Sequence, residues 1–248
     1  MTTLAAVPEI LCAFRNATTL DELALVLTDV AARLRFRYFA MVQHIDFGGT
    51  TTQGLRLHNY PDQWVEVFDR RGLGPIDPVH RASHTTLTAF RWQDVSGMIP
   101  LSALDRDVLA LAGTHGLGDG ITVPAHVPGE LLGSTSFASA ANDDCVDHQL
   151  LAVAQIAGQF AFESSRRLTS RRPCGASLKL TTRQLECIMY VGRGKTDGEI
   201  AEILGLSHNT VVEHLRNARE RYNAAARAAL PVRALYDGAL SFADVLVS

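Results

Sequence analysis

Hydrophobic residues in the first 165 positions follow two kinds of spacing, and the kind changes from segment to segment. Helical spacing predicts helices in four stretches: Pro8 to Leu34, Pro61 to Arg71, Leu101 to Gly113 and Asp147 to Arg167. β-rich runs paired around Gly48-Gly49 and Pro128-Gly129 predict strands at Tyr38 to Ile45, Thr52 to Asn59, Gly120 to Val127 and Glu130 to Ala140. We therefore predict an α+β domain, in which an antiparallel sheet carries helices on both faces as an α-β-α sandwich.

The helical pattern stops near Arg167, and the sequence RRLTSRRPCGAS, which starts at Arg166, offers nothing to pack. We interpret residues 166–177 as a linker between a first domain at 1–165 and a second domain at 178–248. The four arginines of the linker fit a solvated tether, a DNA-contacting arm, or both.

Two short helices are predicted at the start of the second domain. Thr181 or Thr182 can cap the first helix, and Thr196 can cap the second. Glu199 stands three residues after Thr196, which completes a capping box. The side chains expected to face the core are Leu185, Ile188, Met189, Ile200, Ile203 and Leu204.

A tight turn at Gly205 leads into a third helix that Ser207 can cap. The buried stripe expected on this helix is Val211, Leu215 and Ala218. A helix, a short Gly-containing turn and a second helix form a helix-turn-helix, which presents the second helix to the major groove of DNA.

The outer surface of the third helix holds the candidate base contacts. Arg216 has a planar fork that matches guanine, Val212 can touch a thymine methyl group, and Glu213 lies on the same surface. Phosphate contacts are expected from Lys195, Thr196, Ser207, Asn209 and Thr210. The alternative for each polar residue is a helix cap or a solvated side chain.

The formal net charge of −3 hides a division between the two predicted domains. Residues 1–165 hold 10 Arg and Lys against 18 Asp and Glu, a net of −8, whereas residues 166–248 hold 13 against 8, a net of +5. The basic end is therefore the one expected to meet a polyanion such as double-stranded DNA. With 248 residues, of which 47% are hydrophobic, the chain suits two domains with a core each.

The remaining composition argues against metal sites and membranes. Four cysteines, Cys12, Cys145, Cys174 and Cys187, have no CxxC spacing and are interpreted as free thiols. No apolar run reaches membrane-spanning length, and no basic-then-apolar leader opens the chain. We expect a soluble cytoplasmic protein that uses no metal or cofactor.

Three motifs in the second domain stand as LTTRQLE, GKTDGEIAEIL and SHNTVVEHL. In these motifs the chain resembles the DNA-binding domain of LuxR-type regulators, with Gln184 in place of a usual Glu and Tyr222 in place of a usual Leu. The resemblance implies a homodimer on a twofold-symmetric DNA site. Arg227, Ala234 and Gly238 fall at the family's spacing along a fourth helix, which helps to pair two DNA-binding domains in relatives. Pro231 is a third departure and suggests that this helix begins near Val232. The resemblance thus implies an all-α domain of four helices.

The first domain holds a second set of motif residues, followed by GLGDGITVP from Gly116 to Pro124; the set is Tyr60, Trp64, Phe68, Asp77, Pro78 and Trp92. In these spacings the first domain resembles the autoinducer-binding domain of LuxR-type quorum-sensing receptors. Phe68 stands where the family commonly has Tyr. The resemblance implies a transcription factor that binds an N-acyl or aryl homoserine lactone, with its sign of regulation left open.

The chemistry of such a lactone suggests a role for each side chain. Asp77 can accept a hydrogen bond from the amide N–H, and Trp64 can donate its indole N–H to the lactone carbonyl. The Tyr60 hydroxyl can reach the amide carbonyl, for which Ser136 is a second candidate. The apolar wall would include Phe68 and Trp92.

Other interpretations of the same residues stay open at this point. Trp64, Phe68 and Trp92 also suit ordinary core packing, and an Asp before Pro is often only a helix cap. The regulator could answer a non-lactone ligand, or no ligand at all. An enzyme is the third hypothesis: its best material is His80 and His84, four apart on a predicted helix, but neither an HExxH motif nor a third metal ligand accompanies them.

Overall fold

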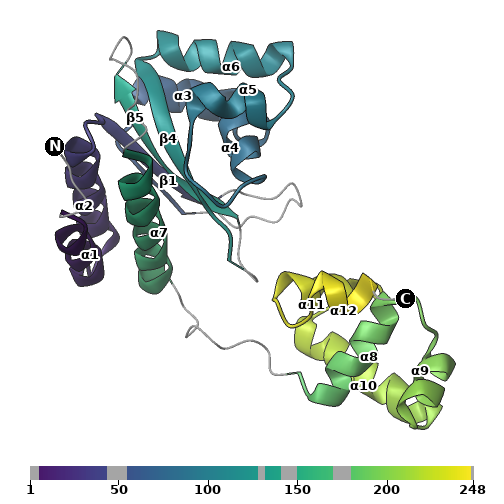
Figure 1. The fold of residues 1–248 in the computed structure, drawn as a ribbon. Helices are drawn as coiled ribbons and strands as arrows, with labels where there is room; N and C mark the ends of the chain where they lie inside the picture. Colours follow the sequence, from purple (N-terminus) through teal and green to yellow (C-terminus); the bar gives the residue numbers. More distant parts are fainter. Residues whose placement is uncertain (1–5, 44–54, 128–131, 141–149, 170–179, 247–248) are drawn as a thin grey trace. The chain divides into compact units, whose positions relative to one another are not determined.

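A computed structural model describes residues 6–43, 55–127, 132–140, 150–169 and 180–246 (Figure 1). The chain divides into two compact units, residues 1–126 with 131–170, and residues 171–248 with 127–130. The predicted turns at Gly48-Gly49 and Pro128-Gly129 lie outside the described residues, as do residues 170–177 of the predicted linker.

The first unit is built on a five-stranded sheet in the order β2-β1-β5-β4-β3, and each neighbouring pair is antiparallel. The strands are β1 (Tyr38–Gln43), β2 (Arg56–His58), β3 (Phe90–Arg91), β4 (Leu117–Ala125) and β5 (Gly133–Ala140). The predicted pairing of the first two runs and of the last two is confirmed. The short β3 was not predicted, because two residues leave no periodic pattern.

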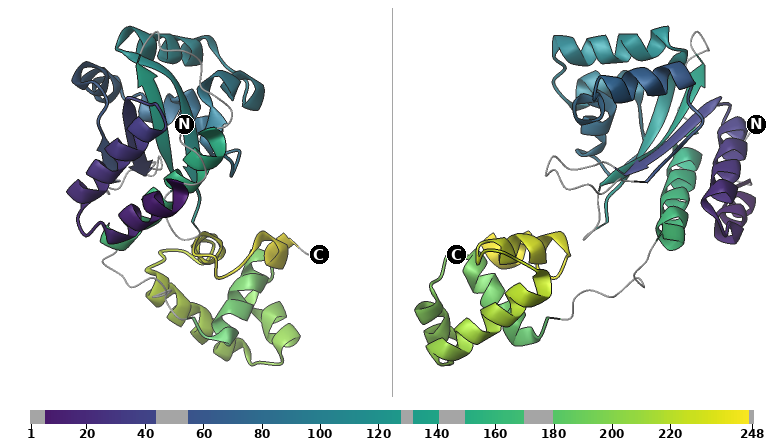
Figure 2. Two further views of the ribbon diagram at one scale, coloured as in Figure 1. Left: turned by 60° about the vertical axis from the view of Figure 1, so that its left-hand side comes forward. Right: turned by 180° about the vertical axis from the view of Figure 1, so that it is seen from behind.

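Helices cover both faces of this sheet (Figures 1 and 2). One face carries α1 (Val7–Asn16), α2 (Leu20–Arg33) and α7 (Leu150–Thr169). The other carries α3 (Asp62–Arg70), α4 (Pro78–Ser83), α5 (Val95–Met98) and α6 (Ala103–Thr114), with the 3-10 turns η2 (Gly74–Ile76) and η3 (Trp92–Asp94). The predicted α-β-α sandwich is therefore confirmed. Its first helical stretch is two helices, because the Thr19 side chain accepts from Glu22 N and caps α2.

Alternation along the strands sends half of their side chains toward α7. Phe137 and Ile121, which lie opposite each other in β5 and β4, are both fully buried. Gly158 lets α7 come close to β4, since a Cβ at this position would lie 2.6 Å from the Cβ of Val123. Residues 134, 136 and 138 of β5 point the other way, into the space that α3 to α6 cover.

Helix α7 continues through Arg166 and Arg167, which corrects the predicted start of the linker. The Arg167 guanidinium donates three hydrogen bonds of 2.7 to 3.1 Å to backbone carbonyls at the end of α1: Phe14, Arg15 and Ala17. The last carbonyls of a helix lack intrahelical partners, and a cationic side chain satisfies them well. A run of arginines that looked solvated thus includes one that ties two helices together.

The second unit contains α8 (Thr182–Gly192), α9 (Asp197–Leu204), α10 (His208–Tyr222), α11 (Ala229–Tyr236) and α12 (Phe242–Leu246). Thr181 and Thr196 begin capping boxes, and Ser207 caps α10 by accepting from Thr210 N. Gly205 closes α9 at a φ of 65°, a left-handed conformation that glycine adopts without steric cost. The predicted caps and turn are confirmed.

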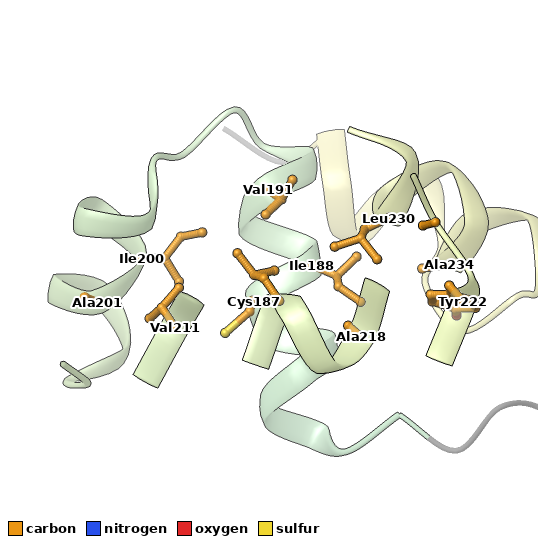
Figure 3. Packing of buried hydrophobic residues seen from close by; sticks show 12 residues of the cluster. Cys187, Ile188, Val191, Ile200, Ala201, Val211, Ala218, Tyr222, Leu230 and Ala234 are labelled. Atoms are coloured by element: carbon orange, nitrogen blue, oxygen red, sulfur yellow. The ribbon is translucent and has the colours of Figure 1, made fainter. Parts of the chain in front are cut away.

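The core of the second unit is one hydrophobic cluster (Figure 3). Its fully buried members include Cys187, Ile188, Ile200, Val211 and Leu230. Cys12 and Cys187 are free thiols, while Cys145 and Cys174 lie outside the described residues. The predicted stripe on α10 is confirmed, because Val211, Leu215 and Ala218 are all buried.

The prediction for Ile203 was wrong, because its side chain is 46% exposed. The inward face of the short helix α9 is set by Ile200 and Ala201, with Leu204 partly buried beside them. At 100° per residue, position 203 lies about 110° from the centre of that face, so an apolar residue there points outward.

The prediction that the fourth helix begins near Val232 was also wrong. Helix α11 starts at Ala229, and Pro231 is the third residue of its first turn. The first four N–H groups of a helix have no intrahelical acceptor, so the missing N–H of a proline is tolerated there. Arg227 and Gly238 flank α11 rather than lie within it, and the described chain adds the short fifth helix α12.

Two of the departures from the family pattern, Gln184 and Tyr222, have structural partners. Gln184 is buried, completes the capping box of Thr181 and accepts a hydrogen bond of 3.1 Å from Arg221. Tyr222 is buried in the core, and its hydroxyl hydrogen-bonds with Asp237. Burial raises the pKa of Tyr222 to about 12. Among the described helices, none is both long enough and apolar enough to cross a membrane.

Candidate functional site

Helix α3 places two aromatic rings against the face of the sheet that α3 to α6 cover. Trp64 and Phe68 are four residues apart and therefore lie on one side of the helix, with ring centroids 5.5 Å apart. Trp64 is buried, and its ring also lies 6.2 Å from that of His115 at the end of α6. Tyr60 lies four residues before Trp64, just ahead of Pro61, the N-cap of α3. Two predicted ligand residues thus lie on one helix, and the third lies in the segment directly before it.

A chain of hydrogen bonds links the aromatic residues to the sheet. The Trp92 indole Nε1 donates to Thr122 Oγ1 over 2.8 Å, and Thr122 Oγ1 lies 2.8 Å from Ser136 Oγ. Ser136 in turn hydrogen-bonds with the Tyr60 hydroxyl. Four side chains from η3, β4, β5 and the segment before α3 therefore form one polar path across the face of the sheet.

Tyr60 interacts both with this polar path, through Ser136, and with the carboxylate of Asp77. Burial raises the pKa of the Tyr60 hydroxyl well above its usual range, and the negative charge of Asp77 raises it further, whereas the hydrogen bond with Ser136 opposes the shift. The phenol therefore keeps its proton at neutral pH. A protonated hydroxyl in this position is a donor for an incoming carbonyl oxygen.

Asp77 has two roles, one for each carboxylate oxygen. Its Oδ1 accepts a hydrogen bond of 2.8 Å from Val79 N, which caps α4, and Pro78 fills the first helical position. Its Oδ2 lies 3.7 Å from His80 Nε2, and the side chain is 14% exposed. The helix-cap interpretation is therefore correct, and the electrostatic contact with Tyr60 adds Asp77 to the polar path.

An apolar shell surrounds these polar groups. Trp64, Leu73, Val108, Ala112, Leu117 and Ala138 form a buried cluster, against which Tyr60, Phe68 and Trp92 pack. An open pocket of about 390 Å³ borders the shell and is lined by Trp92, Gln93, Leu109, Ala112, Gly118 and Asp119. The structure thus brings together all six residues predicted for the ligand: Tyr60, Trp64, Phe68, Asp77, Trp92 and Ser136.

Sequence reasoning missed two groups on this face. Thr122 joins Trp92 to Ser136, and strand alternation after Gly120 within GLGDGITVP was the signal that could have revealed it. His58 lies beside Tyr60, with ring centroids 6.3 Å apart, and only the strand register reveals its direction. His80 contacts Asp77 and the Phe68 ring, and the described residues contain no group of three or more potential metal ligands.

Helix α10 presents its predicted outer surface. Asn209, Val212, Glu213 and Arg216 are exposed, with Val212 at 41%, while Val211 and Leu215 face the core. Arg216 lies on the second helix of the helix-turn-helix, and its side chain is exposed to solvent. The structure therefore leaves the predicted base-reading side chains accessible.

The predicted phosphate contacts also have structural partners. Thr196 caps α9, and its hydroxyl donates to Glu199 Oε2 over 2.8 Å. Lys195 Nζ lies 3.4 Å from Glu199 Oε1, and Ser207 Oγ lies 2.8 Å from Thr210 Oγ1. Hydrogen bonds from the Thr196 backbone N–H and hydroxyl lower the pKa of Glu199. Capping and phosphate contact are compatible roles, because both use the exposed amino-terminal ends of α9 and α10.

A sandwich domain with a polar, aromatic-lined site, carried on one chain with a helix-turn-helix, defines a ligand-responsive transcriptional regulator. Residues 19–165 match the autoinducer binding domain, and residues 178–234 match the bacterial regulatory proteins of the luxR family. The chain belongs to the LuxR family of quorum-sensing transcriptional regulators, as its motifs predicted. This family consists of transcription regulators and not of enzymes.

Individual relatives agree with this membership. The putative HTH-type transcriptional regulator y4qH of Sinorhizobium fredii is 28% identical over 177 residues, which cover 71% of this chain and 54% of that protein. The regulatory protein SdiA of Escherichia coli is 25% identical over 213 residues, covering 85% and 87%. A crystal structure of E. coli SdiA matches with a TM-score of 0.73 at 23% identity, over 94% of this chain and 97% of that chain.

The sensor fold also matches a lactone-dependent regulator. The N-acylhomoserine lactone dependent LuxR family transcription factor CepR2 from Burkholderia cenocepacia has a TM-score of 0.52 at 17% identity, over 68% of this chain and 96% of that chain. At this identity the match shows a shared fold alone.

Proposed function

We propose that the chain binds an N-acyl or aryl homoserine lactone between the sheet and helices α3 to α6, and thereby controls its own binding to DNA. The observation that carries this proposal is the meeting of Tyr60, Asp77 and Ser136 inside an aromatic shell. The lactone dependence in the name of CepR2 supports the choice of ligand class.

Each polar atom of the lactone finds a complementary group. The Asp77 carboxylate would accept a hydrogen bond from the amide N–H, and the protonated Tyr60 hydroxyl would donate one to the amide carbonyl. Ser136 supports the same carbonyl, and the Trp64 indole N–H serves the lactone carbonyl. The rings of Phe68 and Trp92 complete the apolar wall.

We further propose that the regulator binds a twofold-symmetric DNA site as a homodimer in the cytoplasm. Arg216 and Val212 would read base edges, and Glu213 would help to exclude competing bases. Lys195, Thr196, Ser207, Asn209 and Thr210 would hold phosphates. The net charge of +5 over residues 166–248 supports the placement of the DNA contacts in this half of the chain.

Ligand extraction tests the proposal. The full chain is expressed with a panel of acyl- and aryl-homoserine lactones, and the retained small molecules are identified by mass spectrometry. We expect the wild type to retain one lactone and Asp77→Ala to lose it, because the amide N–H would lose its charge-assisted acceptor. Asp107→Ala, at an exposed position on α6, is the matched control and should retain the lactone as the wild type does.

The result that would contradict the proposal is a soluble wild type that retains no lactone from the panel. Equal retention by wild type and Asp77→Ala would instead remove Asp77 from the site. Because Asp77 also caps α4, thermal unfolding of both variants must accompany the extraction.

A second candidate is a regulator of a non-lactone acyl ligand. One solved structure is that of SdiA in complex with octanoyl-rac-glycerol, a molecule with an ester carbonyl and free hydroxyl groups. Such groups could use the same donors at Tyr60 and Ser136, while the Asp77 carboxylate would accept from a glycerol hydroxyl. Recovery of an acylglycerol in place of a lactone in the extraction would favour this candidate.

A further inference from the structure

His58 in β2 carries the unpartnered polar atom of this face. Its Nδ1 is buried and has no hydrogen-bond partner among the described residues. Buried polar side-chain atoms in folded proteins are nearly always hydrogen-bonded, so an unpaired one needs an explanation. A ligand that supplies the missing partner is one such explanation.

The register of the sheet shows which way His58 points. It lies opposite Ala40 in β1, Ala40 lies opposite Ser136 in β5, and Ser136 lies opposite Thr122 in β4. Residues directly opposite each other share a face of the sheet. His58 therefore belongs to the same transverse row as the polar path that ends at Trp92. Its ring centroid, 6.3 Å from that of Tyr60, agrees with this direction.

The position of His58 in this row separates it from the head-group contacts. Two strand spacings, or about 10 Å, lie between the backbones of β5 and β2. Ala40 stands between Ser136 and His58 and contributes only a methyl group. The direction from Ser136 toward β2 therefore leads past this small residue to His58.

The surroundings of His58 decide which tail group it can take. Burial lowers the pKa of His58, and the nearby Arg56 charge lowers it further, against the opposing effect of Asp69 and Asp62. The imidazole is therefore neutral at pH 7, with one nitrogen a donor and the other an acceptor. A hydroxyl or carbonyl fits this group, whereas a carboxylate would face the negative charges of Asp69 and Asp62.

We propose that His58 Nδ1 pairs with an uncharged oxygen on the tail of the ligand, so that this receptor selects lactones with an oxygenated acyl or aryl tail over unsubstituted ones. The inference rests on the proposed lactone function and extends it to the chemistry of the tail.

Matched ligand pairs test the selection. The probes are N-octanoyl-homoserine lactone against its 8-hydroxy derivative, and N-cinnamoyl- against N-(4-hydroxycinnamoyl)-homoserine lactone, because each added oxygen lies far from the amide carbonyl. Binding to the full chain is followed by tryptophan fluorescence, because the only two tryptophans, Trp64 and Trp92, both line the site. We expect at least one oxygenated probe to bind about tenfold more tightly than its unsubstituted partner, the scale of one satisfied buried hydrogen bond.

Three variants assign this preference to one atom. His58→Phe keeps a ring but has no nitrogen. The ratio of the two Kd values within each probe pair should therefore fall close to one, while the unsubstituted lactones still bind. His58→Asn places an amide nitrogen near the position of Nδ1 and should restore part of the preference. His84→Phe, at an exposed position, is the control and should keep the wild-type preference.

The possible failures are distinguishable. Equal or weaker binding of every oxygenated probe to the wild type overturns this inference and leaves the lactone function intact. A preference that survives in His58→Phe also overturns it. If the wild type binds no lactone of either kind, the proposed function fails and this inference fails with it.

Discussion

Tyr60 connects the three kinds of chemistry that the sensor site offers. Its hydroxyl meets the hydroxyl path through Ser136, it lies within the electrostatic reach of Asp77, and its ring contacts Tyr38 edge-on at 6.3 Å. Neither burial nor the neighbouring carboxylate favours ionisation of the phenol, so its proton is held in place. At the scale of single residues, the site is a protonated donor beside a charged acceptor.

Tyr60→Phe tests this pairing directly. The change removes one hydroxyl and keeps the ring, so the protein should fold and bind the retained lactone five- to tenfold more weakly, as expected for one hydrogen bond. Titration of the tryptophan fluorescence with lactone measures the effect. Tyr190→Phe in α8 is the control, because Tyr190 belongs to the second unit. An unchanged affinity in Tyr60→Phe would exclude the hydroxyl as a ligand contact.

The helices and strands were predicted as far as local chemistry determines them. Capping involves residues only three apart, so the sequence alone predicts the helix starts at Thr196, with Glu199, and at Ser207. Ile203 and Pro231 misled the prediction because the orientation of a short helix and the exact position of its first turn depend on packing. Strand alternation within GLGDGITVP indicates the direction of Thr122. Its partners Trp92 and Ser136, and the direction of His58, follow instead from pairing between strands distant in sequence.

Two glycine substitutions test the packing of elements around the site. Gly158→Ala should destabilise the sensor domain by about 1 to 3 kcal/mol, because the new Cβ would lie 2.6 Å from Val123 Cβ where α7 crosses β4. Gly113→Ala is the matched control in α6, where a new Cβ meets nothing within 4 Å, and should stabilise by about 0.5 to 1 kcal/mol. Urea unfolding measures both. Equal effects of the two substitutions would mean that α7 does not pack tightly on the sheet.

At the scale of the whole molecule, the chain divides its tasks by charge. Residues 1–165 have a net charge of −8 and hold the apolar cluster around Trp64, whereas residues 166–248 have a net charge of +5 and expose Arg216 on α10. The acidic first half should not bind DNA phosphates. DNA binding should therefore depend on the basic half and weaken as the salt concentration rises. Ligand present at a hundred to a thousand times its Kd would stabilise the folded sensor by about 3 to 4 kcal/mol.

We propose that ligand binding in one unit controls DNA binding by the other. The most direct test is the Kd of the full chain for a twofold-symmetric DNA site, selected from a random pool, measured at one salt concentration with and without the retained lactone. We predict a change of at least fivefold in the wild type and none in Asp77→Ala. The same Kd with and without lactone, while tryptophan fluorescence reports a filled site, would mean that the ligand does not control DNA binding.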